Sequence, residues 1–207
     1  MSLPDAFFSV IYELGAPHRL SQLRVVASRF SPLDPAVPEL WEGRASALFA
    51  STHAVVADPR STAAWSPVLY APRSSPEPEH ALAVSALVLD LEHVDPERAE
   101  GLRRHLLHRA SLLHTTWGHG TCGEEDCCVR AILLLSRPLR LDEATTLLTL
   151  AQEQLGVDAG PLDRPLPIPC CPRERLHLAR IERNNGWLLD VDAALTTGSL
   201  PSPAVPR

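Results

Sequence analysis

ALAVSALVLDLE, residues 81–92, decides the fold class and points to the chemistry. An apolar run rises to Leu89 and is followed by Asp90, Leu91 and Glu92. Because side chains alternate along a strand, Asp90 and Glu92 share one face and Leu91 takes the other. Two adjacent carboxylates at the end of a buried strand offer the hard oxygen ligands that suit Mg²⁺ or Mn²⁺ and phosphate chemistry. The alternative is a strand that simply ends in solvent, where acidic residues are common.

Length and composition limit the size of the fold and the kinds of partner that the protein can bind. The 207 residues suffice for one domain of fair size or a domain with an accessory lobe, and 45% of them are apolar, which supports a globular core. A formal charge of −6 excludes a strongly basic nucleic-acid-binding surface, so contact with nucleic acid must depend on a local patch. All 19 basic residues are arginine, which excludes lysine as a base or nucleophile.

The sequence predicts a cytoplasmic protein with reduced cysteines and no contact with a membrane. The first residues carry no positively charged signal region, and no apolar run approaches the roughly 20 residues of a membrane span. The five cysteines are an odd number and include two adjacent pairs, Cys127-Cys128 and Cys170-Cys171. This spacing disfavours a disulfide framework and favours free thiols or a metal site.

Residues 1–63 are expected to form a mainly helical N-terminal lobe. The pattern predicts helices over 4–14 and 19–29. A third helix is expected from Asp34, an N-cap followed by proline, to Phe49, because apolar residues recur there at helical spacing.

From residue 64 onward, strands and helices alternate, which predicts an α/β or α+β domain with helices packed on a sheet. This core is expected to span 64–195, and the tail 196–207 to be disordered. The expected elements are a short strand within 65–70, a strand over 82–91, a helix begun by Asp95, a strand over 129–135, a helix from Asp142 to Leu155 and a small terminal element in 187–195.

A third acid and several basic residues complete the candidate site. Asp158 follows the second of these helices, where the chain returns to the edge of the sheet, and Asp163 competes with it as a third metal ligand. Arginine binds phosphate oxygens through paired hydrogen bonds, so arginines beside the acids would suit a triphosphate. Turn acids, loop histidines and surface arginines are the structural alternative. The basic candidates are His114, His119, Arg130 and Arg137.

The cysteines form a candidate zinc site. Zinc needs about four nitrogen or sulfur ligands, usually with a closely spaced cysteine pair. The spacing between Cys122 and Cys127 is at the limit of that range and no second spaced pair follows, so buried, reduced thiols are the alternative. The candidate ligands are Cys122, Cys127 and Cys128, with Cys170, Cys171, His114, His119 or His177.

Taken in order, these segments resemble the primase-like domains of the archaeo-eukaryotic primase (primase-polymerase) superfamily, as carried by bacterial phages, plasmids and integrated elements. The resemblance covers about residues 64–195 and depends on the order and spacing of the motifs rather than on any single one. The matching segments are WSPVLYAP, SALVLDLEHV, HTTWGHG, VRAILLLSRPL, DRPLPIPCCP and GWLLDVDAAL.

The resemblance implies an α+β fold of primase-polymerase type, with an RRM-like catalytic core, a mixed sheet and flanking helices. It also implies roles for individual residues. The metal-binding acids for Mg²⁺ or Mn²⁺ are Asp90, Glu92 and Asp158; the nucleotide-contacting histidine is His119, with His114 next; the basic residues near the triphosphate are Arg130 and Arg137; and Arg164 precedes the Pro-Cys-Pro turn.

The sequence departs from this group at several points. Glu92 replaces the aspartate common in close relatives, the loop 120–128 is acidic and rich in cysteine, and the spacing from Asp158 to Arg164 is short. No helicase segment is recognised. We therefore expect any primase to work with a separate helicase or as a fragment.

Three functions are compatible with these features. The leading one is a DNA primase-polymerase, a template-dependent nucleotidyltransferase that uses two divalent metals to make primers from NTPs or dNTPs on single-stranded DNA. The second is a catalytically degenerate primase-fold module that binds nucleotide or single-stranded DNA. The third is a zinc-stabilised interaction protein built on the cysteine cluster.

Overall fold

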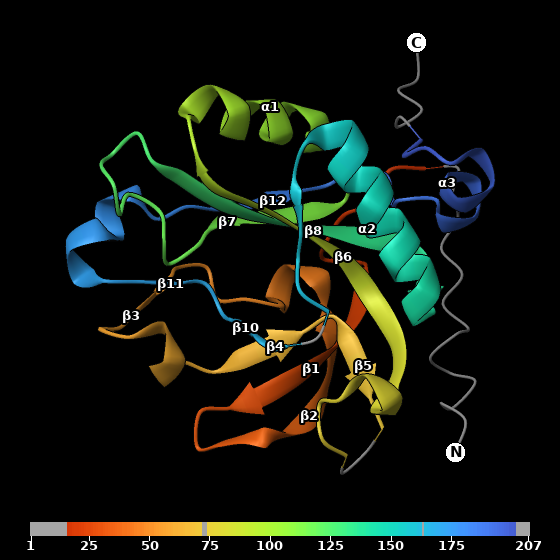
Figure 1. Ribbon diagram of the computed structural model, residues 1–207, viewed down its shortest axis with the longest axis horizontal. Coiled ribbons are helices and arrows are strands. Elements are labelled where there is room, and N and C mark those ends of the chain that lie inside the picture. Colours follow the sequence, from red (N-terminus) through yellow and green to blue (C-terminus); the bar gives the residue numbers. More distant parts are fainter. Residues whose placement is uncertain (1–15, 72–73, 163, 202–207) are drawn as a thin grey trace.

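The strand expected over residues 82–91 forms the centre of the fold. In the computed structural model, which describes residues 16–71, 74–162 and 164–201, it is β6 (Ala81–Val94) and belongs to a six-stranded sheet (Figure 1). Its middle is buried on both faces, as its continuous apolar run requires. All pairings in this sheet are antiparallel. The other strands are β5 (Val68–Tyr70), β7 (Ser111–Thr115), β8 (Cys127–Leu139), β9 (Asp158–Ala159) and β12 (Ile181–Asn184).

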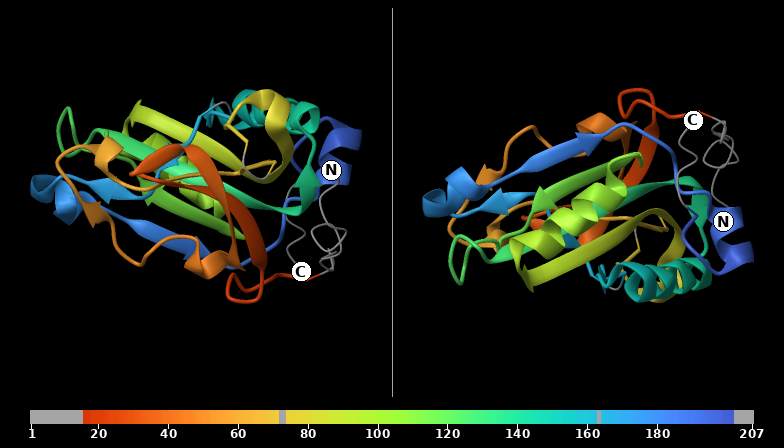
Figure 2. Two further views of the ribbon diagram at one scale, coloured as in Figure 1. Left: turned by 90° about the horizontal axis from the view of Figure 1, so that it is seen from below. Right: turned by 90° about the horizontal axis from the view of Figure 1, so that it is seen from above.

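Helices cover one face of this sheet. α1 (Pro96–Leu106) and α2 (Leu141–Leu155) lie on the side opposite to the N-terminal strands, as the two views of Figure 2 show. The odd-numbered apolar residues of β6, Leu87, Leu89 and Leu91, belong to the core on the helical side. The expected α+β class, with helices packed on a sheet, is therefore confirmed.

Local hydrogen bonds and backbone conformation determine where the helices begin and end. Asp95 accepts the backbone N–H of Arg98 at 2.8 Å, which confirms the predicted cap of α1. α2 begins after Arg140 rather than at Asp142, because the carboxylate of Glu143 accepts the Arg140 N–H at 2.9 Å. It ends at Gly156, whose φ of 62° lies in the left-handed region that glycine adopts readily.

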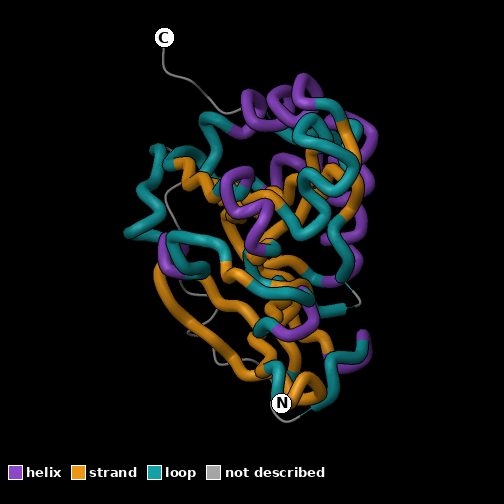
Figure 3. Tube along the Cα trace, turned by 90° about the vertical axis from the view of Figure 1, so that its left-hand side faces the viewer, coloured by secondary structure: helices purple, strands orange, loops and turns teal. Residues whose placement is uncertain are grey.

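A second sheet covers the other face. It joins four of the described strands, and its side chains pack against the even-numbered residues Ala86 and Val88 of β6 and against Ile132 and Leu134 of β8. The central sheet thus lies between a helical layer and a strand layer, an arrangement that Figure 3 also shows. The strands of the second sheet are β1 (Arg24–Ser31), β2 (Asp34–Arg44), β4 (Ala64–Ser66) and β10 (Leu166–Pro167).

The predicted helices over 19–29 and from Asp34 to Phe49 are wrong. These segments form the antiparallel strands β1 and β2, and β1 pairs further with β4, so the described part of the N-terminal lobe is mainly β structure. The apparent helical spacing arose because a strand is followed by a 3-10 turn (Ala45–Ala47), which adds buried residues at spacings of three and four. The predicted helix over 4–14 lies outside the described residues.

Shorter segments complete the fold. β3 (Ala54–Val55) and β11 (Cys170–Cys171) pair in parallel. α3 (Val191–Thr197) corresponds to the small terminal element, and the chain beyond it buries Leu200 in the core on the helical side. Of the expected tail, residues 196–201 are described, and residues 202–207 lie outside the described part. None of the described helices has the length and apolar character to cross a membrane.

Two glycines provide a matched test of this packing. A Cβ at Gly160, beside β9, would lie 2.6 Å from Val88 Cγ1 and 2.8 Å from the Val88 carbonyl oxygen, whereas a Cβ at Gly101 in α1 meets nothing within 4 Å. We expect Gly160→Ala to lower the free energy of unfolding by about 1–3 kcal/mol. Gly101→Ala should raise it by up to about 1 kcal/mol, because alanine favours the helix. Urea denaturation measures both, and a Gly160→Ala protein as stable as wild type would contradict this packing.

Candidate active site

A single row of polar residues crosses the central sheet. Asp90 lies opposite Arg130 of β8 on one side and opposite Asp158 of β9 on the other, and Arg130 lies opposite His114 of β7. Opposite residues of antiparallel strands project from the same face. The row therefore brings Asp158 next to Asp90, with Arg130 and His114 following, on the face that carries the second sheet.

Asp90 and Arg130 form a buried ion pair. Arg130 Nε donates to Asp90 Oδ1 at 2.7 Å and Nη2 donates to Oδ2 at 2.8 Å, and the two side chains are only 7% and 9% exposed. Such a doubly hydrogen-bonded geometry satisfies two charges that would be costly to bury alone. The carboxylate predicted to bind metal is thus directed at an arginine, and each of its oxygens keeps a further lone pair.

Glu92 follows at an irregularity in the sheet. The register of β6 on β8 shifts between Leu91 and Val94, and His93 within this bulge has a φ of 53°. Glu92 itself is exposed and lines a cavity of about 410 Å³. The acid pair expected from the sequence is therefore divided between a buried ion pair and the wall of a cavity.

This cavity gathers several of the predicted site residues. His114, Arg130 and Arg164 line it with Glu92, and the segment around β10 and the turn after β7 supply other parts of its wall. It also contains Arg60, from a 3-10 turn (Pro59–Ser61) that carries no motif in the sequence. Because Arg130 is paired with Asp90, the remaining charges of the lining are the guanidinium groups of Arg60 and Arg164 and the carboxylate of Glu92, which leave a small net positive charge.

His114 is a neutral hydrogen-bond acceptor in this setting. Its Nδ1 must donate to the carbonyl oxygen of Thr115, 2.8 Å away, so Nε2 carries the lone pair. Burial, together with the nearby charge of Arg130, lowers the pKa of His114 to about 3. Nε2 is buried and has no hydrogen-bond partner among the described residues. His114 therefore offers a lone pair at neutral pH rather than a positive charge.

His119 is not among the residues that line the cavity. Its Nδ1 accepts the backbone N–H of Cys128 at 3.1 Å, and burial lowers the pKa of its ring. The turn that carries it is held by Arg175, whose Nη1 donates to the carbonyl oxygens of Trp117 and His119 at 2.8 and 2.9 Å. Arg175 is a positioning residue that motif reading did not find.

Arg137 is far from the other candidates. It lies seven residues beyond Arg130, about 23 Å along an extended strand. Its guanidinium donates to both oxygens of Glu143 at 3.0 Å and to Asp192 at 2.8 Å, and hydrogen bonding to Glu143 raises its pKa. The structure therefore uses Arg137 to connect β8 with the first turns of α2 and α3. Asp163, the competing third acid, lies outside the described residues.

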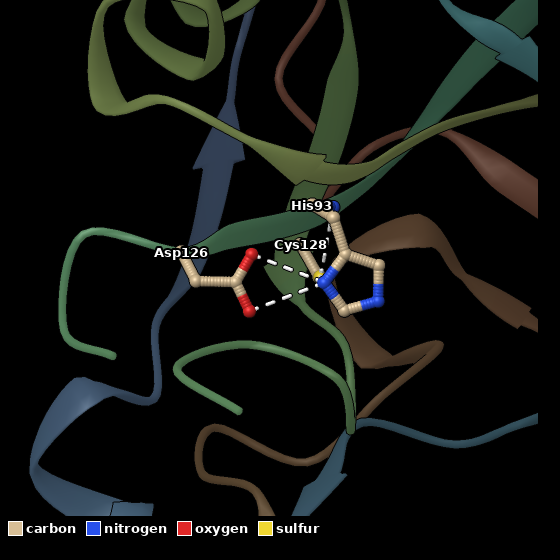
Figure 4. Close-up of side chains that lie close together, drawn as sticks. All are labelled: His93, Asp126 and Cys128. Carbon is tan, nitrogen blue, oxygen red and sulfur yellow. Dashed lines mark hydrogen bonds and ion pairs between the residues drawn. The ribbon is translucent and has the colours of Figure 1, made fainter. Parts of the chain in front are cut away.

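The cysteines do not group as expected. Cys122 is exposed, whereas Cys127 and Cys128 are buried, and all are free thiols. Within the described residues, the group of three ligand atoms close enough to share a metal ion is His93, Asp126 and Cys128, shown in Figure 4. Neither the three cysteines 122, 127 and 128 nor the acids 90, 92 and 158 form such a group. Burial raises the pKa of Cys170 to about 11.

Comparison with known proteins reveals a structural similarity. No protein-family model and no curated protein match the chain. Among solved structures, the chain is similar to the AEP domain of the cyanophage S-2L primase-polymerase, with a TM-score of 0.49 and 15% sequence identity over 91% of each chain.

The depressed pKa of His114 predicts acid sensitivity. Below pH 6.5 the unfolded chain takes up a proton that the folded chain refuses until about pH 3, so stability falls as the pH decreases through this window. At pH 5 this contribution amounts to about 2 kcal/mol. His114→Asn keeps a donor near Thr115 but removes the titration, so its stability should fall less between pH 6.5 and 5 in urea denaturation.

His108→Gln is the matched control, because the His108 ring is exposed. This variant should follow the wild-type dependence on pH. Parallel curves for wild type and His114→Asn would contradict the assignment.

Proposed function

We propose that the chain is a template-dependent nucleotidyltransferase of primase-polymerase type, which makes primers on single-stranded DNA. The observation that supports this most is the row of residues across the sheet. In this row Asp158 is opposite Asp90, and Arg130, the next residue in the row, lines a cavity of about 410 Å³ together with Arg60 and Arg164. Acids beside guanidinium groups are the combination that metal-assisted transfer of a nucleoside triphosphate requires.

Asp90, Glu92 and Asp158 are the residues proposed to bind Mg²⁺ or Mn²⁺. Asp90 and Asp158 are opposite each other in the sheet, Glu92 follows two residues after Asp90, and oxygen is the ligand that these hard cations prefer. Arg130 engages each Asp90 oxygen once, so a lone pair on each stays available for a cation. When bound, the ions would activate a 3′-hydroxyl and neutralise charge on the triphosphate.

The cavity is proposed to take the incoming nucleotide. Its volume is within the range of small-molecule sites, about 300–1,000 Å³. Arg60 and Arg164 are exposed at the cavity and can each bind phosphate oxygens through paired hydrogen bonds, with Arg130 behind them. Trp117 offers an aromatic surface to a base.

A second candidate is a primase-fold module that binds nucleotide or single-stranded DNA without catalysis. Two observations favour it: both oxygens of Asp90 are engaged by Arg130, and the ligand atoms of Asp90, Glu92 and Asp158 do not converge within the described residues. Nucleotide binding that depends on Mn²⁺ but leads to no incorporation would identify this second function.

Primer synthesis tests the catalytic proposal directly. The assay contains single-stranded template, labelled NTPs or dNTPs, and Mn²⁺ or Mg²⁺. Glu92→Gln and Asp158→Asn change exposed side chains, so the fold should survive, and each should lower incorporation by at least about 100-fold through loss of a metal ligand. Glu153→Gln, an exposed acid on α2, is the control and should retain full incorporation.

The outcomes separate the candidates. Incorporation by wild type that is unchanged in both variants would remove these acids from the mechanism. The proposed catalytic function would be rejected if the wild type binds nucleotide yet incorporates none with either metal.

The positions of the arginines predict which of them contribute to nucleotide binding. Arg60→Ala and Arg164→Ala should each weaken binding of a labelled triphosphate by about tenfold, because each removes a charged hydrogen-bond donor. Arg137→Ala should leave binding unchanged and lower the melting temperature, because Arg137 connects β8 with Glu143 and Asp192. Fluorescence anisotropy with Mn²⁺ measures the first effect and a thermal melt the second. Equal losses of binding in Arg137→Ala and Arg164→Ala would place the phosphates elsewhere.

A further inference from the structure

We infer that a zinc-class divalent ion binds His93, Asp126 and Cys128, at a site separate from the proposed Mg²⁺ or Mn²⁺ ligands. The imidazole, carboxylate and thiol ligand atoms of these residues all lie within 4.8 Å of one another. Figure 4 shows the Asp126 carboxylate and the Cys128 sulfur both directed at Nδ1 of His93. Three different ligand types that converge on one point form a cluster that the proposed nucleotidyltransferase chemistry does not use.

The distances agree with tetrahedral coordination. His93 Nδ1 is 3.1 and 3.2 Å from the two Asp126 oxygens and 3.8 Å from Cys128 Sγ. With zinc bonds of about 2.0–2.1 Å to nitrogen and oxygen and about 2.3 Å to sulfur, tetrahedral angles require about 3.3 Å and about 3.5 Å between these pairs. The distances from Nδ1 to the carboxylate oxygens and to the sulfur therefore lie within a few tenths of an ångström of these values, and the Asp126 and Cys128 ligand atoms are within 4.8 Å of each other.

Backbone geometry and hydrogen bonds hold these ligands in position before any metal binds. The register shift in β6 turns His93 back over β8, where its backbone N–H donates to Cys128 Sγ at 3.2 Å. Asp126 Oδ2 accepts the backbone N–H of Cys122 at 3.1 Å, and the Asp126 N–H donates to the carbonyl oxygen of Gly123 at 3.0 Å. A metal would consequently find its ligands ordered rather than having to gather them from mobile chains.

The surroundings leave room for an ion from one side. A Cβ at Gly118 would lie 3.2 Å from Cys128 Sγ and 3.9 Å from His93 Cε1, so the backbone closes the site there. The Asp126 side chain is 10% exposed, whereas that of His93 is 56% exposed. Water can therefore reach the cluster past His93 and complete a fourth coordination position.

The ligand set selects the metal. A thiolate, an imidazole nitrogen and one carboxylate oxygen suit Zn²⁺ and its spectroscopic substitute Co²⁺, whereas Mg²⁺ prefers oxygen ligands throughout. Binding would release the thiol proton of Cys128 and connect the loop before β8 to the end of β6. Glu92 and Gly118, which are close to these ligands, line the cavity of about 410 Å³, so the ion would stabilise one wall of it.

Metal binding to the full-length chain tests the inference independently of any enzymatic activity. The protein is purified under reducing conditions, stripped with a chelator, and titrated with Zn²⁺ against a chromophoric competitor and with Co²⁺ by absorption spectroscopy. The expected result is one equivalent of either ion, with a thiolate-to-cobalt charge-transfer band, unaffected by excess Mg²⁺. Failure of the wild type to bind either ion in preference to Mg²⁺ would overturn the site.

Variants locate the ion. His93→Gln, Asp126→Asn and Cys128→Ser each remove one ligand and should weaken binding by at least about 100-fold, more than the loss of a supporting contact. Cys122→Ser and Cys127→Ser are the matched controls and should bind like wild type. Loss of binding in the controls with retention in Cys128→Ser would move the site to the other cysteines and refute the inference.

Folding is monitored by circular dichroism, because Cys128 is buried. Should Cys128→Ser fail to fold, His93→Gln, whose side chain is largely exposed, decides the question. Undiminished zinc binding by a folded His93→Gln protein would refute the three-ligand site.

Discussion

The buried pair of Asp90 and Arg130 fixes the register on which the rest of the structure depends. Apolar contacts alone would tolerate several alignments of β6 and β8, because both strands are apolar on both faces. A shift of one residue would move Asp90 to the helical face and leave two buried charges without partners, at a cost of several kcal/mol. Because β7 and β9 pair with these same strands, the correct alignment also sets the positions of His114 and Asp158.

The core of the fold was predictable because its elements are long and strongly patterned. The apolar runs of β6 and β8 and the spacing of α1 and α2 follow from local sequence. The N-terminal strands were not predictable in this way. In β1 and β2, polar and apolar residues mix, and their strand conformation depends on partners that include β4 and, through it, β10 more than a hundred residues later. Tertiary pairing overrode the local helical pattern there.

The residues of the candidate site also fall into two groups: those that local sequence could predict and those that depend on tertiary structure. Asp90, Asp158 and Arg130 could be expected from strand ends and alternation, and the structure brings them together. Arg137 resembles them in that it also follows an apolar strand. However, β8 runs antiparallel to β6, so Arg137, near the C-terminal end of β8, lies far from the C-terminal end of β6 where Asp90 is found. Arg60 enters the cavity from a turn far earlier in the chain, and His93 meets Asp126 only because of a bulge. A short sequence motif predicts neither where a distant turn packs nor where a strand forms a bulge.

The pairing of early with late segments has a consequence for synthesis. β4 pairs with β10, β3 pairs with β11, and His18 bridges to Gly186. On the ribosome, the first quarter of the chain therefore emerges long before its partners exist. The β1–β2 hairpin and its pairing with β4 can form early, but completion of the second sheet by β10 must wait until most of the chain has been translated. Such high contact order predicts slow, late folding and a nascent chain that benefits from chaperone protection.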